Sequence, residues 1–329
     1  MKKQFLLASF LIVFGSYLVM ANQHATNQEN FQVTYYDHFD NVVKKVRYNS
    51  EKKARILKYN KQISHYSADG ELVQVEVYFT KAKSDRTGDL KHTSYFNRGG
   101  KKARIEKYHN QKKIREEKIF KTILHLTDQG RIEKVERLSA DPKIEQTHIS
   151  RSIDKMDRKG RVVQRIQYYM ANPESIGPAY QKITDFDSNG QKVRMTTQYL
   201  NQESNELGYY KSIFYYNQTL HKEREEWYMT DSFKHEKQIE KMTFFFDSNG
   251  IKTKQEVYPT NIGAQRLGVS RTVFKYRRDG TKASMIRYYT DEIKVQKGYH
   301  KGVTIFDENE STLKEEIFDN RNRLLELVQ

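Results

Sequence analysis

The chain has 329 residues, a formal net charge of +16 and no cysteine, which excludes disulfide bonds, thiolate chemistry and a lipid-modified cysteine. Its 23 tyrosines and 17 phenylalanines, against 16 glycines and 4 prolines, favour ordered β structure over disorder. Basic and acidic residues are interleaved, which predicts a solvated surface whose cationic bias favours anionic partners.

The first residues have the layout of a secretory signal. Lys2 and Lys3 precede an apolar run from Phe5 to Met20, and the small residue Ala21 follows it. We expect residues 1–21 to be a cleaved signal peptide. An uncleaved anchor is the alternative, but the run is shorter than the roughly 20 residues that a spanning helix needs. The expected location is therefore the periplasm, the outer surface or the medium, and residues 22–30 are predicted to be a polar lead segment.

Residues 31–329 repeat every thirty residues. Steps of thirty in both directions from Gly250 reach ten residues, which we call the turn positions, and seven of them are glycine: Gly70, Gly100, Gly130, Gly160, Gly190, Gly250 and Gly280. Every turn position has a large apolar or aromatic residue four before it and a β-branched residue seven before it, and seven have a tyrosine eight after it. A register kept over ten copies predicts one repeat array without a second domain.

The segments Asp-Ser-Asn-Gly at 187–190 and 247–250 are the best-preserved copies of a turn. A short polar residue followed by glycine at the fourth position predicts a type I turn with a left-handed glycine, which has no Cβ to clash at positive φ. The seven glycines are therefore predicted to be structural. The first and last units lack the glycine, as terminal repeats often do, and Leu220 at the seventh turn position is expected to mark a bend.

The predicted fold is all-β: an antiparallel meander of about ten 30-residue β-hairpin repeats in an elongated or spiral sheet. One face is expected to be aliphatic and inward, with the β-branched row and residues such as Val73 and Val75. The other is expected to carry the aromatic rows beside rows of basic residues and glutamate. Longer and more variable links, such as residues 201–208 and 259–268, are expected along one edge.

The tyrosine rows allow two interpretations. Cross-strand aromatic pairs can stabilise a half-exposed sheet, and tyrosine beside a cation can form a stacking and charge platform for sugars or other anionic polymers. The second interpretation gives these candidate binding residues: Tyr48, Tyr78, Tyr108, Tyr168, Tyr228, Tyr258, Tyr288, Arg104, Arg224 and Lys254. The interleaved glutamates make nucleic acid an improbable partner, because phosphate binding favours an unbroken positive stripe.

Signals of metal binding or catalysis are weak. Residues 185–190 begin like a calcium loop, but Thr196 stands where the loop needs a bidentate glutamate. The ten histidines form no zinc motif or paired cluster with ligand spacing, and no nucleophile elbow or phosphate loop is present. We predict no metal, no cofactor and no catalytic residue, and hence a protein that is not an enzyme.

The pattern FDSNGxKxxxxxxY resembles the tyrosine-rich hairpin repeats of the YD (RHS-type) class and is similar to MORN-like repeats of exported bacterial proteins. The thirty-residue spacing is longer than in either class, and the Gly-x-Gly of MORN repeats is missing. The resemblance implies a β array that encloses, scaffolds or binds, and it transfers no catalytic residue.

The expected function is an interaction scaffold of the bacterial envelope. Its partner would be an anionic glycan, a lipid headgroup surface or another envelope protein. Two alternatives remain open: an outer-membrane β-barrel, and an antitoxin or enclosing shell protein, which the resemblance alone suggests.

Overall fold

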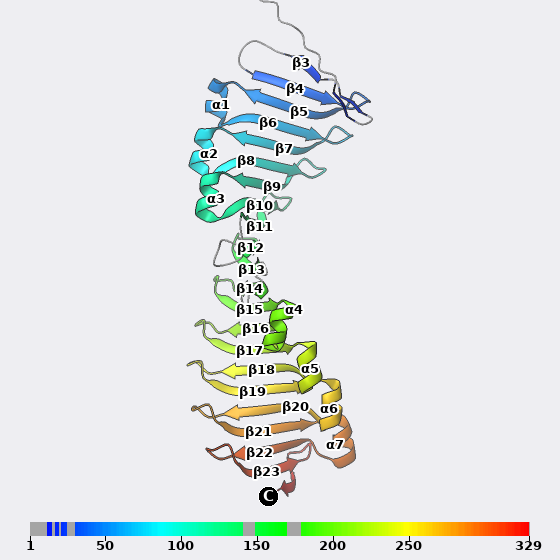
Figure 1. The fold of residues 1–329 in the computed structure, drawn as a ribbon, viewed down its shortest axis with the longest axis vertical. Helices are drawn as coiled ribbons and strands as arrows, with labels where there is room; N and C mark the ends of the chain where they lie inside the picture. Colours follow the sequence, from blue (N-terminus) through cyan, green and yellow to red (C-terminus); the bar gives the residue numbers. More distant parts are fainter. Residues whose placement is uncertain are drawn as a thin grey trace, which may run out of the picture. The chain divides into compact units, whose positions relative to one another are not determined.

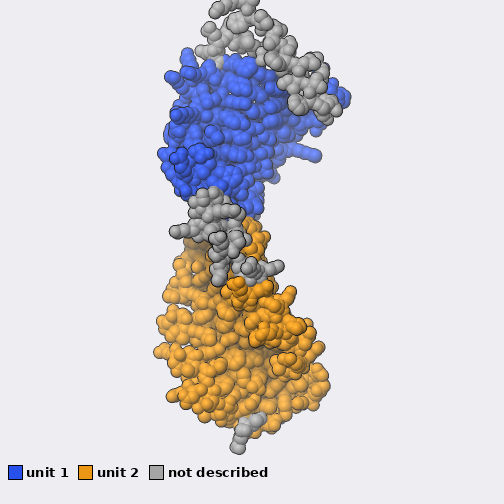
Figure 2. Space-filling view, viewed as in Figure 1, with its two compact units in different colours: residues 1–145, 149–161 blue, residues 146–148, 162–329 orange. Residues whose placement is uncertain are grey.

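The computed structural model describes residues 12–14, 17–19, 21–24, 30–140, 149–169 and 179–328. The chain divides into two compact units (Figure 2). Unit 1 contains residues 1–145 and 149–161, and unit 2 contains residues 146–148 and 162–329. The predicted signal peptide and polar lead segment fall mostly outside the described residues.

Unit 1 alternates hairpins with short helices. Its elements are β1 (Ile12–Phe14), β2 (Tyr17–Val19), β3 (Ala21–His24), β4 (Asn30–Tyr36), β5 (Val42–Asn49), α1 (Glu51–Leu57), β6 (Tyr59–Tyr66), β7 (Leu72–Phe79), α2 (Lys81–Thr87), β8 (Asp89–Phe96), β9 (Lys102–His109), α3 (Gln111–Glu117), β10 (Ile119–Leu126), β11 (Ile132–Ser139) and β12 (Ile149–Met156).

Unit 2 follows the same alternation. Its elements are β13 (Val162–Tyr169), β14 (Ala179–Phe186), β15 (Lys192–Tyr199), α4 (Asn201–Leu207), β16 (Tyr209–Tyr216), β17 (Lys222–Met229), α5 (Asp231–Lys237), β18 (Ile239–Phe246), β19 (Lys252–Pro259), α6 (Asn261–Leu267), β20 (Val269–Tyr276), β21 (Lys282–Tyr289), α7 (Asp291–Lys297), β22 (Lys301–Phe306), β23 (Thr312–Phe318) and β24 (Leu324–Val328).

Within each unit, successive strands pair antiparallel with their neighbours in sequence, from β3 to β12 in unit 1 and from β13 to β24 in unit 2 (Figure 1). Among the described strands, β3 pairs only with β4 and β24 only with β23, so the sheet is unclosed. The all-β prediction of antiparallel hairpin repeats of about thirty residues is confirmed. The structure therefore decides that the sheet is open, which the sequence did not show.

The turns form where the sequence predicts them. In the seven repeat turns that begin with Asp or Asn, the side-chain oxygen of this first residue accepts hydrogen bonds from two backbone N–H groups. At Asp187 these come from Asn189 at 2.8 Å and Gln191 at 2.9 Å. The turn position has positive φ in every described hairpin, including the glycine-free turns at Asp40, Leu220 and Glu310. The bend expected at Leu220 is therefore wrong, because this hairpin keeps the same turn and register as its neighbours.

The links between hairpins were predicted incorrectly. All seven described helices, α1–α7, have seven residues, so these links are regular rather than variable. In five of them a Ser, Thr or Asn side chain accepts a hydrogen bond from the N–H of the third helical residue. Each ends at a left-handed residue such as Gly208 after α4. Within each unit the helices stand along one edge, as expected (Figure 1).

The predicted assignment of faces is wrong because a β-bulge lies next to the turn in each of the nine repeat hairpins whose strand pairing is described. Tyr66 pairs with Leu72 as expected, but the register then shifts, and His65 pairs with Gln74 and Ile63 with Glu76. The β-branched row therefore shares a face with the glutamates and with the tyrosines eight after the turn. The aromatic residue four before the turn lies on the opposite face, where Lys45 approaches the Tyr66 ring.

The interior of this sheet is polar. Among the described residues, only ten hydrophobic residues are buried, compared with eighteen polar or charged residues. Glutamate is prominent among the latter: Glu106, Glu136, Glu225, Glu226 and Glu256. The inward aliphatic face that the sequence predicted does not form. Stability must therefore come largely from satisfied polar contacts between repeats, because buried charges are tolerated only when they are paired.

Candidate binding surface

The predicted tyrosines lie in a ladder with lysines that the sequence analysis did not single out. In unit 1, Lys61 stands 5.3 Å from the Tyr48 ring centre and 5.4 Å from that of Tyr78. Lys91 stands 5.3 Å from Tyr78 and 4.6 Å from Tyr108. Lys61 and Lys91 therefore each bridge the tyrosines of two repeats through cation–π contacts. We call the face that carries this ladder the tyrosine face.

Unit 2 repeats the arrangement. Lys241 lies 5.3 Å from the Tyr228 ring and 5.6 Å from the Tyr258 ring. The Arg271 guanidinium lies 4.3 Å from the Tyr288 ring. At Tyr168 the partner is aromatic instead: its ring makes an edge contact with Tyr180 at 6.5 Å. The structure thus joins Tyr48, Tyr78 and Tyr108 within unit 1, and joins Tyr228 with Tyr258 in unit 2.

The tyrosine face also carries a row of glutamates, six residues after the turn positions. These glutamates form ion pairs with lysines of the same face. Glu106 accepts a hydrogen bond from the Tyr108 hydroxyl at 2.8 Å and an ion pair from Lys121 at 2.9 Å. In unit 2, Glu226 has the same partners, Tyr228 at 2.9 Å and Lys241 at 3.3 Å. Glu106 and Glu226 therefore each connect the tyrosine of their own hairpin to the lysine of the next hairpin.

The pKa values of this face follow from these contacts. Burial acts to raise the pKa of Glu136, but hydrogen bonds and charge from Lys134 and Arg151 outweigh it and lower the pKa to about 2. Burial, together with the hydrogen bond to Glu226, raises the pKa of Tyr228 to about 12. Glu136 is thus ionised and Tyr228 neutral throughout the physiological range.

The three predicted cations lie on the tyrosine face, four residues after their turn positions. Arg104 pairs with Glu106 at 3.3 Å and covers the Tyr95 ring at 3.9 Å. Arg224 covers Tyr215 at 3.7 Å, and Lys254 covers Phe245 at 3.6 Å. The Arg104 side chain remains 41% exposed, against 17% for Lys121. The predicted cations are therefore the accessible row, and the bridging lysines are the enclosed row.

Sequence reasoning missed two periodic signals. The bridging lysines occur nine residues before successive turn positions, and the helix caps recur as a Ser, Thr or Asn ten residues after most of them. A capping residue followed eight positions later by glycine, as in Thr80 with Gly88 and Thr260 with Gly268, is the signature of a short helix. These signals were available in the sequence.

Two histidines that are distant in sequence converge in unit 1. Asp89 contacts His92 Nε2 at 2.8 Å and His109 Nδ1 at 2.9 Å, and His109 Nε2 contacts the Thr122 hydroxyl at 2.9 Å. The order carboxylate, imidazole, hydroxyl is that of a nucleophilic triad. The His109 side chain is only 1% exposed, however, so no substrate can reach it, and the network is structural.

Burial lowers the pKa of both histidines, and for His109 the Lys113 charge adds to this effect. A pKa lowered by folding means that the unfolded chain binds the proton more readily. The stability from this network is therefore present above the ordinary histidine pKa of 6.5 and is lost as the pH falls below it. The spacing of these two histidines along the chain gave no sign that they converge on one carboxylate.

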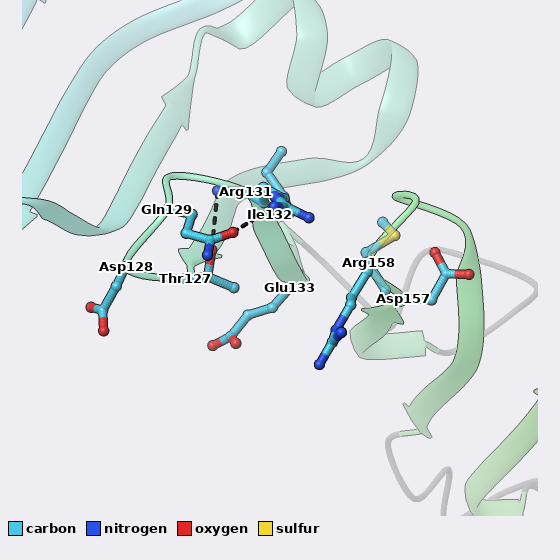
Figure 3. A pocket seen from close by; sticks show the side chains of 9 residues that line it. Thr127, Asp128, Gln129, Arg131, Ile132, Glu133, Asp157 and Arg158 are labelled. Carbon is cyan, nitrogen blue, oxygen red and sulfur yellow. Dashed lines mark hydrogen bonds between the residues drawn. The ribbon is translucent and has the colours of Figure 1, made fainter.

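A cleft of about 590 Å³ lies at the hairpin ends of unit 1, between the β10–β11 turn and the turn after β12 (Figure 3). Arg131 and Arg158 line it together with three carboxylates, on Asp128, Glu133 and Asp157. Asp157 is held by backbone N–H groups and by Arg161. Three carboxylates against two guanidinium groups give the lining a net charge of −1, so the cleft offers no surplus of positive charge to an anionic ligand.

Among the described residues, no group of His, Asp and Glu side chains could hold a metal ion. Over the same part of the chain, no helix is both long and apolar enough to cross a membrane.

Comparison with known proteins gives no family. The sequence matches no family model and no curated protein. Two solved structures are similar to it: TcdB2-TccC3, at 9% identity and a TM-score of 0.17 over 95% of this chain, and TcdB2-TccC3 without its hypervariable C-terminal region, at 10% identity and a TM-score of 0.17 over 94%. The chain spans about a fifth (19%) of the length of those chains. The resemblance to YD repeats stays a prediction.

Proposed function

We propose that this chain is an exported, non-enzymatic β-repeat scaffold of the bacterial envelope that binds an anionic partner. The observation that carries the proposal is a surplus of cations around the glutamates of several repeats. Glu106 is matched by Arg104 and Lys121, Glu136 by Lys134 and Arg151, and Glu226 by Arg224 and Lys241. Two cations for each carboxylate leave about one positive charge per repeat on the tyrosine face.

Repetition turns this small surplus into a surface for a long partner. One hairpin advances the sheet by two strand spacings, about 9.6 Å, so similar cationic groups recur at that interval within a unit. A polymer that is held weakly at one repeat meets the next repeat at high effective concentration. The partner classes that fit are an anionic glycan, a lipid headgroup surface or an acidic face of another envelope protein.

Binding to a polyanion tests the binding role. The full chain should be retained on immobilised heparin at low ionic strength and released as salt is raised, because exposed charges are screened by salt. A matrix of neutral dextran is the control and should not retain it. Passage through the heparin matrix even at the lowest salt would contradict the proposal.

Export is tested separately by expressing the gene in a Gram-negative host. The proposal expects the chain in the periplasmic or surface fraction, with an N-terminus at Asn22 by mass spectrometry. Full-length chain confined to the cytoplasm would contradict export and leave the binding test unaffected.

A further inference from the structure

The largest concentration of uncompensated charge lies on the helices of unit 1, away from the tyrosine face. The segments 51–58, 81–88 and 111–118, which contain α1, α2 and α3 with their C-caps, are here called the cationic helix column. They hold eleven lysines and arginines and four carboxylates, a net charge of +7. The corresponding segments of α4–α7, residues 201–208, 231–238, 261–268 and 291–298, hold five basic and six acidic residues, a net charge of −1.

Most of these cations are exposed and have no ion-pair partner. Among the described residues of the column, eight cations are in no ion pair. Lys83 is half-buried over the Phe79 ring, and the other seven are exposed: Lys52, Lys58, Lys81, Arg86, Lys112, Arg115 and Lys118. Arg55 pairs with Glu51 at 3.7 Å, but both side chains are over 80% exposed, so that pair is weak. The charge of the column is therefore available to a partner.

The helices of the column are held in line. The N–H of Thr80 before α2 donates to the Lys58 carbonyl at the end of α1, at 3.2 Å, and the N–H of Asn110 donates to the Gly88 carbonyl at 2.8 Å. The Asn110 amide also donates to the Ser84 carbonyl at 2.8 Å. Figure 1 shows α1, α2 and α3 one after another along one edge of the strands. The cations thus form a line that is fixed before a partner binds, which limits the entropy lost on binding.

We infer that the cationic helix column is a docking surface for a linear acidic polysaccharide. The inference deepens the proposed function and rests on it. Lysine and arginine donate charge-assisted hydrogen bonds to carboxylate or sulfate groups, and the column repeats them about every 9.6 Å. Two sugar rings of an extended chain span a similar length, so acidic groups on alternate sugars meet successive helices.

The other anionic partners fit the column less well. Single-stranded nucleic acid is held by aromatic stacking as well as charge, and the three segments contain no aromatic residue. A membrane surface needs an apolar helix face; on α1 the exposed apolar residues are Ile56 and Leu57, and α2 has no large apolar residue. A narrow line of cations without either feature suits a chain of acidic sugars.

Two matched variants of the full chain test the inference. The column variant is K81Q/K112Q/R115Q, and the control variant is K237Q/R266Q/K297Q on α5, α6 and α7. Each replaces two lysines and one arginine, all exposed and all helical, and each lowers the net charge by the same amount. Circular dichroism and urea unfolding establish that both variants keep the fold.

The probes are heparin, vesicles of phosphatidylglycerol and a DNA duplex, each titrated over a range of salt concentrations. The column variant should bind heparin at least tenfold more weakly, with a salt dependence shallower by roughly two to three counterions, while the control variant stays within twofold of the unmodified chain. Equal losses in the two variants would overturn the column as the site and leave the proposed function intact. Tighter column-dependent binding to vesicles or DNA would overturn the polysaccharide. No heparin binding by the unmodified chain would overturn both proposals.

Discussion

At the residue scale, two kinds of left-handed glycine serve different purposes. The turn glycines, such as Gly190, have positive φ and open space where a Cβ would lie. Three turn positions are occupied by other residues with φ near 60°, so glycine lowers strain there without being indispensable. At the helix ends, Gly208 also has positive φ, but a Cβ would stand 2.9 Å from the Phe233 ring of the next helix.

The two glycines therefore predict different costs of substitution. Gly190→Ala should lower the free energy of unfolding by about 1 kcal/mol, the cost of a Cβ at positive φ. Gly208→Ala should lower it by roughly 2–3 kcal/mol, because the new methyl group also displaces Phe233. Urea unfolding of the two variants measures the difference, and equal losses would show that the packing of α4 on α5 adds nothing.

The glutamate row makes the free energy of unfolding depend on pH in the acid range. Because folding lowers the pKa of Glu136 from 4.5 to about 2, its contribution is complete above pH 4.5 and is lost as the pH falls towards 2. Glu136→Gln should lower the free energy of unfolding at pH 7 by roughly 2–3 kcal/mol and should flatten its fall between pH 4.5 and 2.

Urea unfolding across that pH range checks this prediction, with Glu133→Gln as the matched control, since Glu133 is exposed three residues earlier on β11. A steep acid dependence that survives in Glu136→Gln would contradict the assigned role of the carboxylate.

At the scale of the element, the repeat is a hairpin followed by a capped helix, and the cap also joins neighbours. Asn110 accepts a hydrogen bond from the Lys113 N–H at 3.0 Å and donates its amide to Ser84 of the preceding helix. Ser50 makes only the first kind of contact, with the Lys53 N–H at 3.3 Å. The two caps therefore separate local helix capping from the connection between helices.

Asn110→Ala should lower the free energy of unfolding by about 2 kcal/mol, since it removes a helix cap together with the side-chain hydrogen bonds to Ser84, whose carbonyl then keeps only the Gly88 N–H as donor. Ser50→Ala should cost about 0.5–1 kcal/mol, which is the value of a cap alone. Chemical denaturation gives both numbers. A smaller loss for Asn110→Ala than for Ser50→Ala would contradict the role of Asn110 in joining α2 to α3.

At the scale of the whole molecule, contacts run mainly between neighbouring repeats, so a complete repeat should be removable. Deletion of residues 81–110 joins Thr80, itself a helix cap, to the first residue of α3 and keeps the thirty-residue register. This variant should fold with a similar β content and a somewhat lower stability, as expected for a repeat array.

Deletion of residues 81–95 is the contrasting variant, because it removes half of a repeat and puts the bridging lysines and tyrosines out of step. Far-ultraviolet circular dichroism and urea unfolding should show lost cooperativity. Equal behaviour of the two deletions would contradict the repeat as the unit of folding.

The sequence by itself determined the thirty-residue period and the hairpin turns at the ten predicted turn positions, because turn formation depends on a few adjacent residues such as Asp187 and Gly190. It did not predict the turn at residues 319–322 between β23 and β24. It did place the predicted tyrosines and cations on one face of the sheet. These features depend on spacing along one strand, which is visible in a list of residues.

The tertiary structure decided which rows share that face. A single bulge beside each turn shifts the register between the two strands, so Ile63 faces Glu76 where unbroken pairing would place it opposite Val75. That shift brings the bridging lysines to the tyrosines and encloses the glutamates among cations. The choice of a bulge is made by backbone hydrogen bonding and by the packing of both strands together, and counting along one strand does not reveal it.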